Sequence, residues 1–224
     1  MEHFSSRYPR LAHVQNITPT NERDVFWHWA KAEFTSLRFS EGYVNLTPRV
    51  QTLLRSGQKE NLTASDWENL QSITLWYRRP LLVGLRRLGT NWFTDVLRYD
   101  ELPNVLTMTL PDFVAAAPSR RLSDFAAALD RGEIDPAQNE LIRSYKQTRD
   151  TFSLERLTAA PILVAESKDG PYVLLEGYSR LSAMTSLHLR EDLTNGAIDV
   201  LLGVCNNLRE WYLSDNRREC RLHI

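Results

Sequence analysis

The chain has 224 residues, of which 42% are hydrophobic and 25% are charged, and its formal net charge is -1. A chain of this composition buries a substantial core, and its nearly neutral charge excludes a global electrostatic attraction to DNA or to a membrane surface. Because it has two cysteines without a CxxC pair, no secretory pattern and no apolar run near the ~20 residues of a membrane helix, we expect a reduced, cytoplasmic protein.

Residues 1–90 are expected to form a helical extension. The first 21 residues are polar and contain two prolines, which predicts a loose arm. Helices are predicted from apolar side chains at helical spacing, from a cap at Asn21 and from a cap at Thr63 or Ser65, and Pro80 interrupts the last of them. These predicted helices cover residues 22–38, 48–55, 65–79 and 81–88. Their aromatic side chains favour packing against a sheet over stacking on nucleic-acid bases.

Residues 91–224 are expected to form an α+β domain. Short apolar runs bounded by turn residues predict the strands, and the turn from Lys168 to Pro171 makes the third and fourth strands antiparallel. The predicted strands cover residues 92–98, 105–110, 161–166, 172–176 and 198–204. Helices are predicted over 122–131, from Pro136, over 179–189, and from an Asn206 cap through Leu213. The first of these helices is expected to end at Gly132.

The most informative stretch is the turn that joins the fourth strand to the following helix. It places a carboxylate at Glu176, a glycine at Gly177, a hydroxyl at Ser179 and a guanidinium at Arg180 within five positions. A strand that opens through glycine directly into a helix directs free main-chain N–H groups and the positive end of the helix dipole toward one point. This arrangement predicts a site for a phosphate or another anion.

Around this turn the chain resembles the ParB/sulfiredoxin superfamily. The resemblance rests on the helix over 122–132, on the strand Pro161-Ile-Leu-Val, on the pattern Gly177-x-x-Arg180-x-x-Ala183 and on the closing strand over 198–204. It covers about residues 105–205, less than half of the chain. It implies a ParB/sulfiredoxin-like small mixed sheet with flanking helices, to which residues 1–90 are an extension.

The resemblance also implies a function and roles for the residues of the turn. Gly177, Tyr178, Ser179 and Arg180 would bind ATP or another nucleotide, with Mg²⁺ as a second cofactor, and Glu176 and Arg180 would be catalytic. Stand-alone members of the superfamily, such as fertility-inhibition proteins of conjugative plasmids, combine ATPase and DNase activity. The expected activity is therefore a bacterial ATP-dependent phosphohydrolase, nuclease or phosphotransferase in plasmid, phage or other DNA-related biology.

Several departures from the family keep other functions open. Tyr178 stands where sulfiredoxins carry a reactive cysteine, so sulfinic-acid reduction is not expected, and the turn has one arginine where chromosome-partition members have two. No helix-turn-helix follows the turn. A non-catalytic module that binds a nucleotide or a protein partner, the latter through the N-terminal helices, is the second hypothesis, and a DNA-binding regulator is the third.

Structural explanations compete with each functional one. The turn can be a plain strand–helix connection with Ser179 as the helix cap, a solvated Arg180 and a surface carboxylate at Glu176. Tyr178 can stack on a base or face solvent. Three arginine pairs, at 78–79, 86–87 and 120–121, can track phosphates or form solvated faces. His28 and His188 lie on predicted helices without metal-ligand companions three or four residues later on the same helix, so neither is assigned to a metal.

Overall fold

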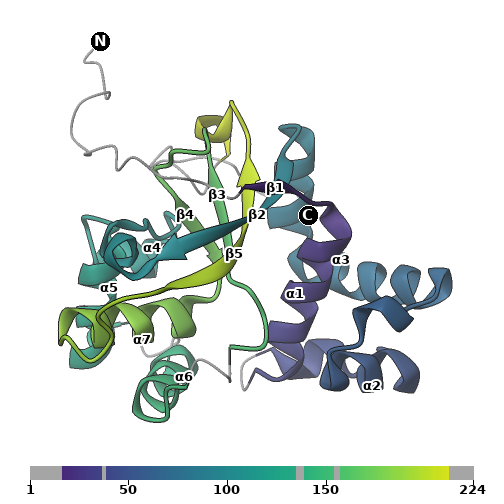
Figure 1. Cartoon of the computed structure of the whole chain (residues 1–224), viewed down its shortest axis with the longest axis horizontal. Coiled ribbons are helices and arrows are strands. Elements are labelled where there is room, and N and C mark those ends of the chain that lie inside the picture. The colour runs from purple at the N-terminus through teal and green to yellow at the C-terminus, as the bar shows by residue number, and fades with distance from the viewer. Residues whose placement is uncertain (1–16, 37–38, 135–138, 154–156, 212–224) are drawn as a thin grey trace.

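A five-stranded mixed sheet runs through the middle of the chain in the computed structural model, which describes residues 17–36, 39–134, 139–153 and 157–211 (Figure 1). The strand order is β1-β2-β5-β3-β4. The β3 and β5 strands pair in parallel, and the other neighbours are antiparallel. The strands are β1 (Thr18–Pro19), β2 (Asn91–Arg98), β3 (Ile162–Ala165), β4 (Val173–Glu176) and β5 (Ala197–Val204). The expected α+β class is confirmed.

Helices cover both faces of this sheet (Figure 1). They are α1 (Glu22–Phe34), α2 (Pro48–Ser56), α3 (Ala64–Arg87), α4 (Pro111–Ala116), α5 (Leu122–Arg131), α6 (Asn139–Asp150) and α7 (Tyr178–Leu189). Short 3₁₀ turns are η1 (Ser40–Tyr43), η2 (Lys59–Asn61), η3 (Tyr99–Asn104) and η6 (Leu208–Glu210). Within the described part of the chain, no helix combines the length and the apolar character needed to cross a membrane.

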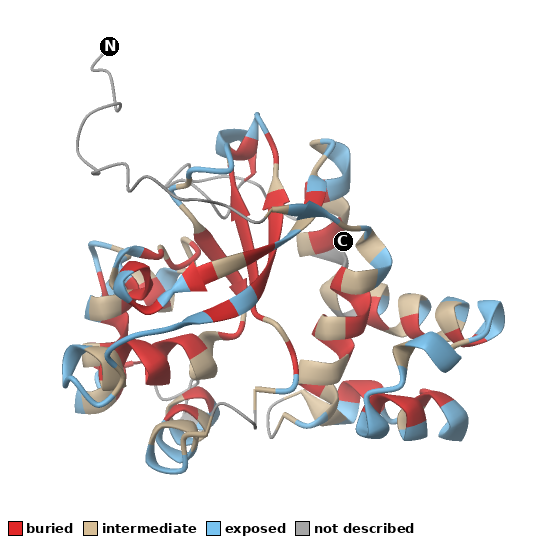
Figure 2. Cartoon of the chain, in the orientation of Figure 1, coloured by how far each residue is buried: buried red, intermediate tan, exposed pale blue. Residues whose placement is uncertain are grey.

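The strands alternate between two hydrophobic clusters, as the two-residue period of a strand requires. On one face, Leu163, Leu174 and Leu202 pack with residues of α5, α6 and α7. On the other face, Val164 and Leu201 belong to a cluster that also contains residues of α1 and of the second half of α3. Figure 2 shows the buried strands between these two layers. The helical extension therefore shares a core with the α+β part, as its aromatic helices predicted.

A third cluster lies within the helical extension itself. Trp27 and Ala30 of α1 pack there with Val50 and Leu54 of α2 and with Leu70 of α3. The α1 helix thus contacts the sheet with one side and the other helices with the other.

The capping residues act as the sequence indicates. Asn21 accepts hydrogen bonds from the N–H groups of Arg23 and Asp24, Thr63 and Asp66 form a reciprocal capping box, and Gly132 ends α5 in a left-handed conformation. The interruption expected at Pro80 appears as a kink inside a single α3 helix, at Arg78 (φ -115°, ψ 15°). The kink lies two residues before Pro80, and a proline inside a helix has no N–H for the hydrogen bond to the preceding turn.

Three boundary predictions are corrected. Residues 105–110 do not form a strand: only Leu106 makes isolated bridges, and Pro111 begins α4 instead. The helix after β4 begins at Tyr178 with Gly177 as its cap, so Ser179 is not the cap. The last helix is reduced, within the described residues, to η6, preceded by Asn207. Leu213, Pro136 and most of the predicted N-terminal arm lie outside those residues.

Candidate functional site

The turn between β4 and α7 requires glycine for two reasons. Gly177 has φ +105°, a left-handed conformation that side chains disfavour. A Cβ atom placed on it would lie 3.0 Å from the Cβ atom of Pro161 and 3.4 Å from Nη2 of Arg180. Residue 177 therefore lies directly against the chain entering β3 and against the guanidinium of its own helix.

The two predicted catalytic side chains are brought together by the turn. Arg180 donates from Nη2 to Oε2 of Glu176, four residues earlier, and from Nη1 to the carbonyl oxygen of Ala159. Each of the two side chains is only 16% exposed. Burial, with a smaller contribution from the Glu33 carboxylate, raises the pKa of Glu176, and Arg180 opposes this shift. The alternative in which Arg180 is solvated and Glu176 is a surface group is therefore wrong.

The first main-chain N–H groups of α7 have the arrangement expected of an anion site. None of the described side chains caps this helix, and the first intrahelical bond at its start runs from the N–H of Leu181 to the carbonyl oxygen of Gly177, at 2.9 Å. The N–H groups of Tyr178, Ser179 and Arg180 precede that bond. Unpaired N–H groups and the helix dipole favour negative charge at such an end.

The Tyr178 side chain points into the core. Its hydroxyl accepts from the N–H of Met108 at 3.0 Å and donates to the carbonyl oxygen of Leu174 at 2.7 Å. Its ring packs against Phe113 and Phe125, with centroids 4.8 and 5.8 Å away, and burial raises its pKa. The part that residue 178 offers to an anion is thus its main-chain N–H rather than its ring.

The helical extension reaches the turn through contacts that the sequence does not reveal. His28 of α1 accepts at Nδ1 from the N–H of Ala160, at 2.9 Å, across 132 positions of sequence. Glu33 of α1 pairs with Arg78 at the α3 kink and accepts a 2.8 Å hydrogen bond from the Tyr43 hydroxyl. A lone histidine on a helix gives no periodic signal for such a contact, so sequence analysis could not assign His28 to the site.

The carboxylates near the turn do not fit a magnesium site. Glu176 is paired with Arg180 and Glu33 with Arg78. Among the described residues, no group of three or more His, Cys, Asp or Glu side chains is placed to hold a metal ion. Magnesium prefers oxygen ligands in near-octahedral geometry, whereas these oxygens already accept from guanidinium groups.

The arginine pairs are largely used inside the protein. Arg78 pairs with Glu33, Arg86 forms a two-point contact with Glu22 at 2.6 and 2.5 Å, and Arg120 donates to the carbonyl oxygen of Thr107 at 2.9 and 2.7 Å. One arginine of each pair is thus bound to a protein acceptor. This arrangement disfavours a continuous stripe that follows phosphates.

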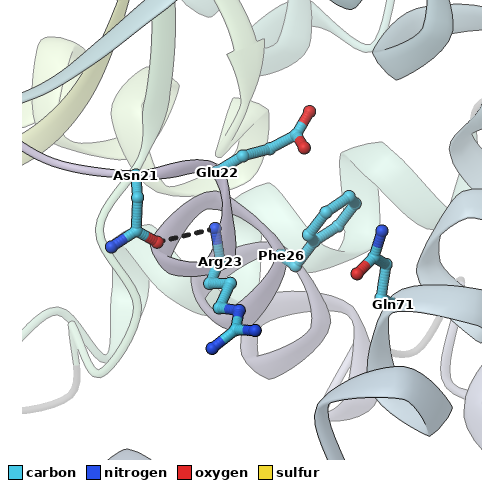
Figure 3. Close-up of a pocket in the computed structure, with 5 residues that line it drawn as sticks. All are labelled: Asn21, Glu22, Arg23, Phe26 and Gln71. Atoms are coloured by element: carbon cyan, nitrogen blue, oxygen red, sulfur yellow. Dashed lines mark hydrogen bonds between the residues drawn. The ribbon is translucent and has the colours of Figure 1, made fainter. Parts of the chain in front are cut away.

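An open surface depression lies away from the turn, on the helical extension (Figure 3). It is lined by Asn21, Glu22, Arg23, Phe26 and Gln71. The one carboxylate that lines it, Glu22, forms an ion pair with Arg86. The guanidinium of Arg23 lies 5.7 Å from the centroid of the Trp67 ring. The depression therefore belongs to the packing of α1 against α3.

No family model, no curated protein and no solved structure matches this chain.

Proposed function

We propose that this chain is a nucleotide-binding protein of the ParB/sulfiredoxin type, and that it binds the phosphates of ATP or another nucleotide at the start of α7. The observation that carries the proposal is the helix start at residues 178–180, whose N-cap Gly177 is left-handed and has no side chain to accept from these N–H groups. Three main-chain donors and one guanidinium are the groups that bind phosphate in proteins.

The order of elements supports the same proposal. The α5 helix, the β3–β4 hairpin, the Gly177 turn, α7 and β5 occur in the order that the resemblance implies, with α6 inserted between α5 and β3. The β3 strand lies between β4 and β5, so the turn emerges at one edge strand of the sheet. The order of these elements along the chain and the position of β4 in the sheet therefore support the resemblance.

Phosphate binding at this turn requires the Glu176–Arg180 pair to rearrange. Arg180 would exchange the Ala159 carbonyl for a phosphate oxygen, a stronger charge-assisted acceptor. Glu176 would lose part of its compensation, and because burial already raises its pKa, the carboxyl would take up a proton more readily. A hydrolase would use Glu176, whose pKa is raised, as a general base toward water or a hydroxyl.

The ion pair between Glu176 and Arg180 favours a second candidate function, a non-catalytic switch. The carboxylate and guanidinium neutralise each other and are held by a main-chain carbonyl, so a bound nucleotide changes the local structure whether or not it is hydrolysed. In this candidate Glu176 sets the energy of the closed state and takes no part in chemistry. The DNA-binding regulator is the least supported candidate, because Arg78, Arg86 and Arg120 bind protein acceptors.

Thermal melts with ATP, CTP and ADP, with and without Mg²⁺, test the binding proposal. A nucleotide that binds the folded state raises the melting temperature in proportion to RT ln(1 + [L]/Kd). We expect the shift in the wild type and in Arg209→Ala, which removes an exposed guanidinium paired with Glu166, but not in Arg180→Ala. An equal shift in Arg180→Ala would contradict the site.

Phosphate release separates the two candidates. Turnover that is lost in Glu176→Gln while nucleotide still raises the melting temperature supports the enzyme. Nucleotide binding without turnover in the wild type supports the switch. A steep dependence of DNA affinity on salt would instead revive the regulator.

A further inference from the structure

Three consecutive residues, Ala159, Ala160 and Pro161, form a strap that ties the turn to the helical extension. The Ala159 carbonyl accepts from Arg180 of α7, and the Ala160 N–H donates to His28 of α1. The Pro161 carbonyl accepts from the N–H of Leu201 of β5, at 2.9 Å. Each residue of the strap is thus held by a different element.

His28 is suited to hold the strap at neutral pH. Burial, together with the nearby charges of Lys59, Lys31 and Arg180, lowers its pKa to about 4, and Asp24 opposes this shift. The imidazole is therefore neutral at pH 7, with Nδ1 free to accept from Ala160 and the proton on Nε2. His28 and Ala160 are 132 positions apart in the sequence, so their hydrogen bond links the helical extension to the site.

The strap keeps Arg180 from offering both of its terminal nitrogens to a ligand. Nη1 is bound to Ala159 and Nη2 to Glu176, whereas two-point recognition of a phosphate needs two parallel N–H donors. The strap also covers Gly177 closely, since Pro161 lies 3.0 Å from the position of a Cβ atom there. Phosphate binding by Arg180 therefore requires Ala159 to move.

We propose that the strap is an autoinhibitory contact, in which α1, acting through His28, holds the Ala159 carbonyl on Arg180 and so restrains phosphate binding at the α7 start. The ligand in this proposal, a nucleotide phosphate, is taken from the proposed function, on which the proposal therefore rests. The α1 helix is bound to the rest of the extension through the Asp24–Lys59 and Glu33–Arg78 pairs. A partner that shifts the extension would thereby loosen the strap and release the guanidinium.

The test compares His28→Ala, which removes the acceptor, with His28→Asn, whose side-chain oxygen can accept in place of Nδ1. His188→Ala is the matched control, because His188 lies near the other end of α7 and its Nδ1 contacts Leu193. Two quantities are measured: ATP affinity by calorimetry and solvent exchange of the Arg180 side-chain N–H groups by NMR, which needs no nucleotide. Thermal melts establish that each variant is folded.

Autoinhibition predicts that His28→Ala binds ATP about fivefold more tightly than the wild type, the factor that about 1 kcal/mol for one hydrogen bond gives. It also predicts faster exchange at Arg180, with wild-type values restored in His28→Asn and kept in His188→Ala. Weaker ATP binding in His28→Ala, or Arg180 exchange unchanged from the wild type, overturns the proposal. If neither the wild type nor any variant binds ATP, the proposed function fails, and the exchange rates still decide whether His28 restrains Arg180.

Discussion

Arg180 and Glu176 neutralise each other across the Gly177 turn, and each side chain is only 16% exposed. The pair is linked by the Ala159 carbonyl to the strap and, through Ala160, to His28 of the helical extension. Since the start of α7 lies at the same turn, the charges of this pair contribute to the electrostatic potential at that helix end.

Removal of both members of the pair should cost less than the sum of the two single removals. Arg180→Ala leaves a largely buried carboxylate without a partner, so we expect the free energy of unfolding at pH 7 to fall by about 3 kcal/mol. The double variant with Glu176→Gln should lose less than the sum of the single losses. Urea unfolding of the four proteins in a double-mutant cycle measures this, and strict additivity would show that the pair is not coupled.

Gly177→Ala should destabilise the protein more than an alanine at another left-handed glycine. Both Gly177 and Gly132 have positive φ, +105° and +72°, but only at Gly177 does the new Cβ atom meet a neighbour, Pro161 at 3.0 Å. We expect a loss of about 1 kcal/mol at Gly132 from the backbone conformation, and about 2–3 kcal/mol at Gly177 because overpacking adds to it. Equal losses in the free energy of unfolding, measured with urea, would mean that the strap moves to accommodate the new Cβ atom without an energetic cost.

Tyr178→Phe should lower stability although it leaves the ring in place. The hydroxyl accepts from Met108 and donates to Leu174, so its removal leaves a buried N–H and a buried carbonyl without this partner. We expect a loss of about 2 kcal/mol. Tyr172→Phe, which removes an exposed hydroxyl bonded to the Lys168 carbonyl, should cost under about 1 kcal/mol. A neutral Tyr178→Phe substitution would argue that the hydroxyl is kept for another purpose.

The lowered pKa of His28 gives stability a defined pH dependence. Between the unfolded value of 6.5 and the folded value of about 4, the unfolded chain binds a proton that the folded chain does not. Stability from this group is therefore complete above pH 6.5 and is lost as the pH falls toward 4, by about 3 kcal/mol at 1.36 kcal/mol per pKa unit.

Urea unfolding of the wild type and of His28→Asn at pH 7, 5.5 and 4.5 isolates this contribution. Other titrating groups, including Glu176 with its raised pKa, are common to the two proteins and cancel in the difference. The stability difference should shrink as the pH falls. A difference that stays constant over this range would contradict the neutral state of His28 in the folded protein.

The local parts of the fold were predictable because their signals are local. Asn21, Thr63 and Gly132 mark helix ends by their own hydrogen bonds or backbone conformation, and the turn at Gly170 brings β4 back along β3. The Glu176–Arg180 pair was not predicted, because Glu176 ends β4 and the helical relation between residues four apart does not extend across the left-handed Gly177.

The parts that failed depend on partners far away in sequence. Residues 105–110 have the composition of a strand, but the N–H of Thr107 binds Arg120 and the N–H of Met108 binds Tyr178. The inward orientation of Tyr178 and the contact from His28 likewise arise only when distant elements pack. Composition and periodicity carry no information on such pairings. Bringing distant residues together lowers the entropy of the chain, and the packing of the whole core offsets this loss.

The most direct measurement is an NMR titration of the ¹⁵N-labelled protein with ATP, following the main-chain N–H signals of Tyr178, Ser179 and Arg180. Phosphate binding at the start of α7 predicts that these three signals and that of Gly177 shift most, and that Arg180→Ala abolishes the shifts while Arg209→Ala preserves them. Signals at the turn that stay unmoved at millimolar ATP, or shifts confined to the depression lined by Asn21 and Gln71, would contradict it.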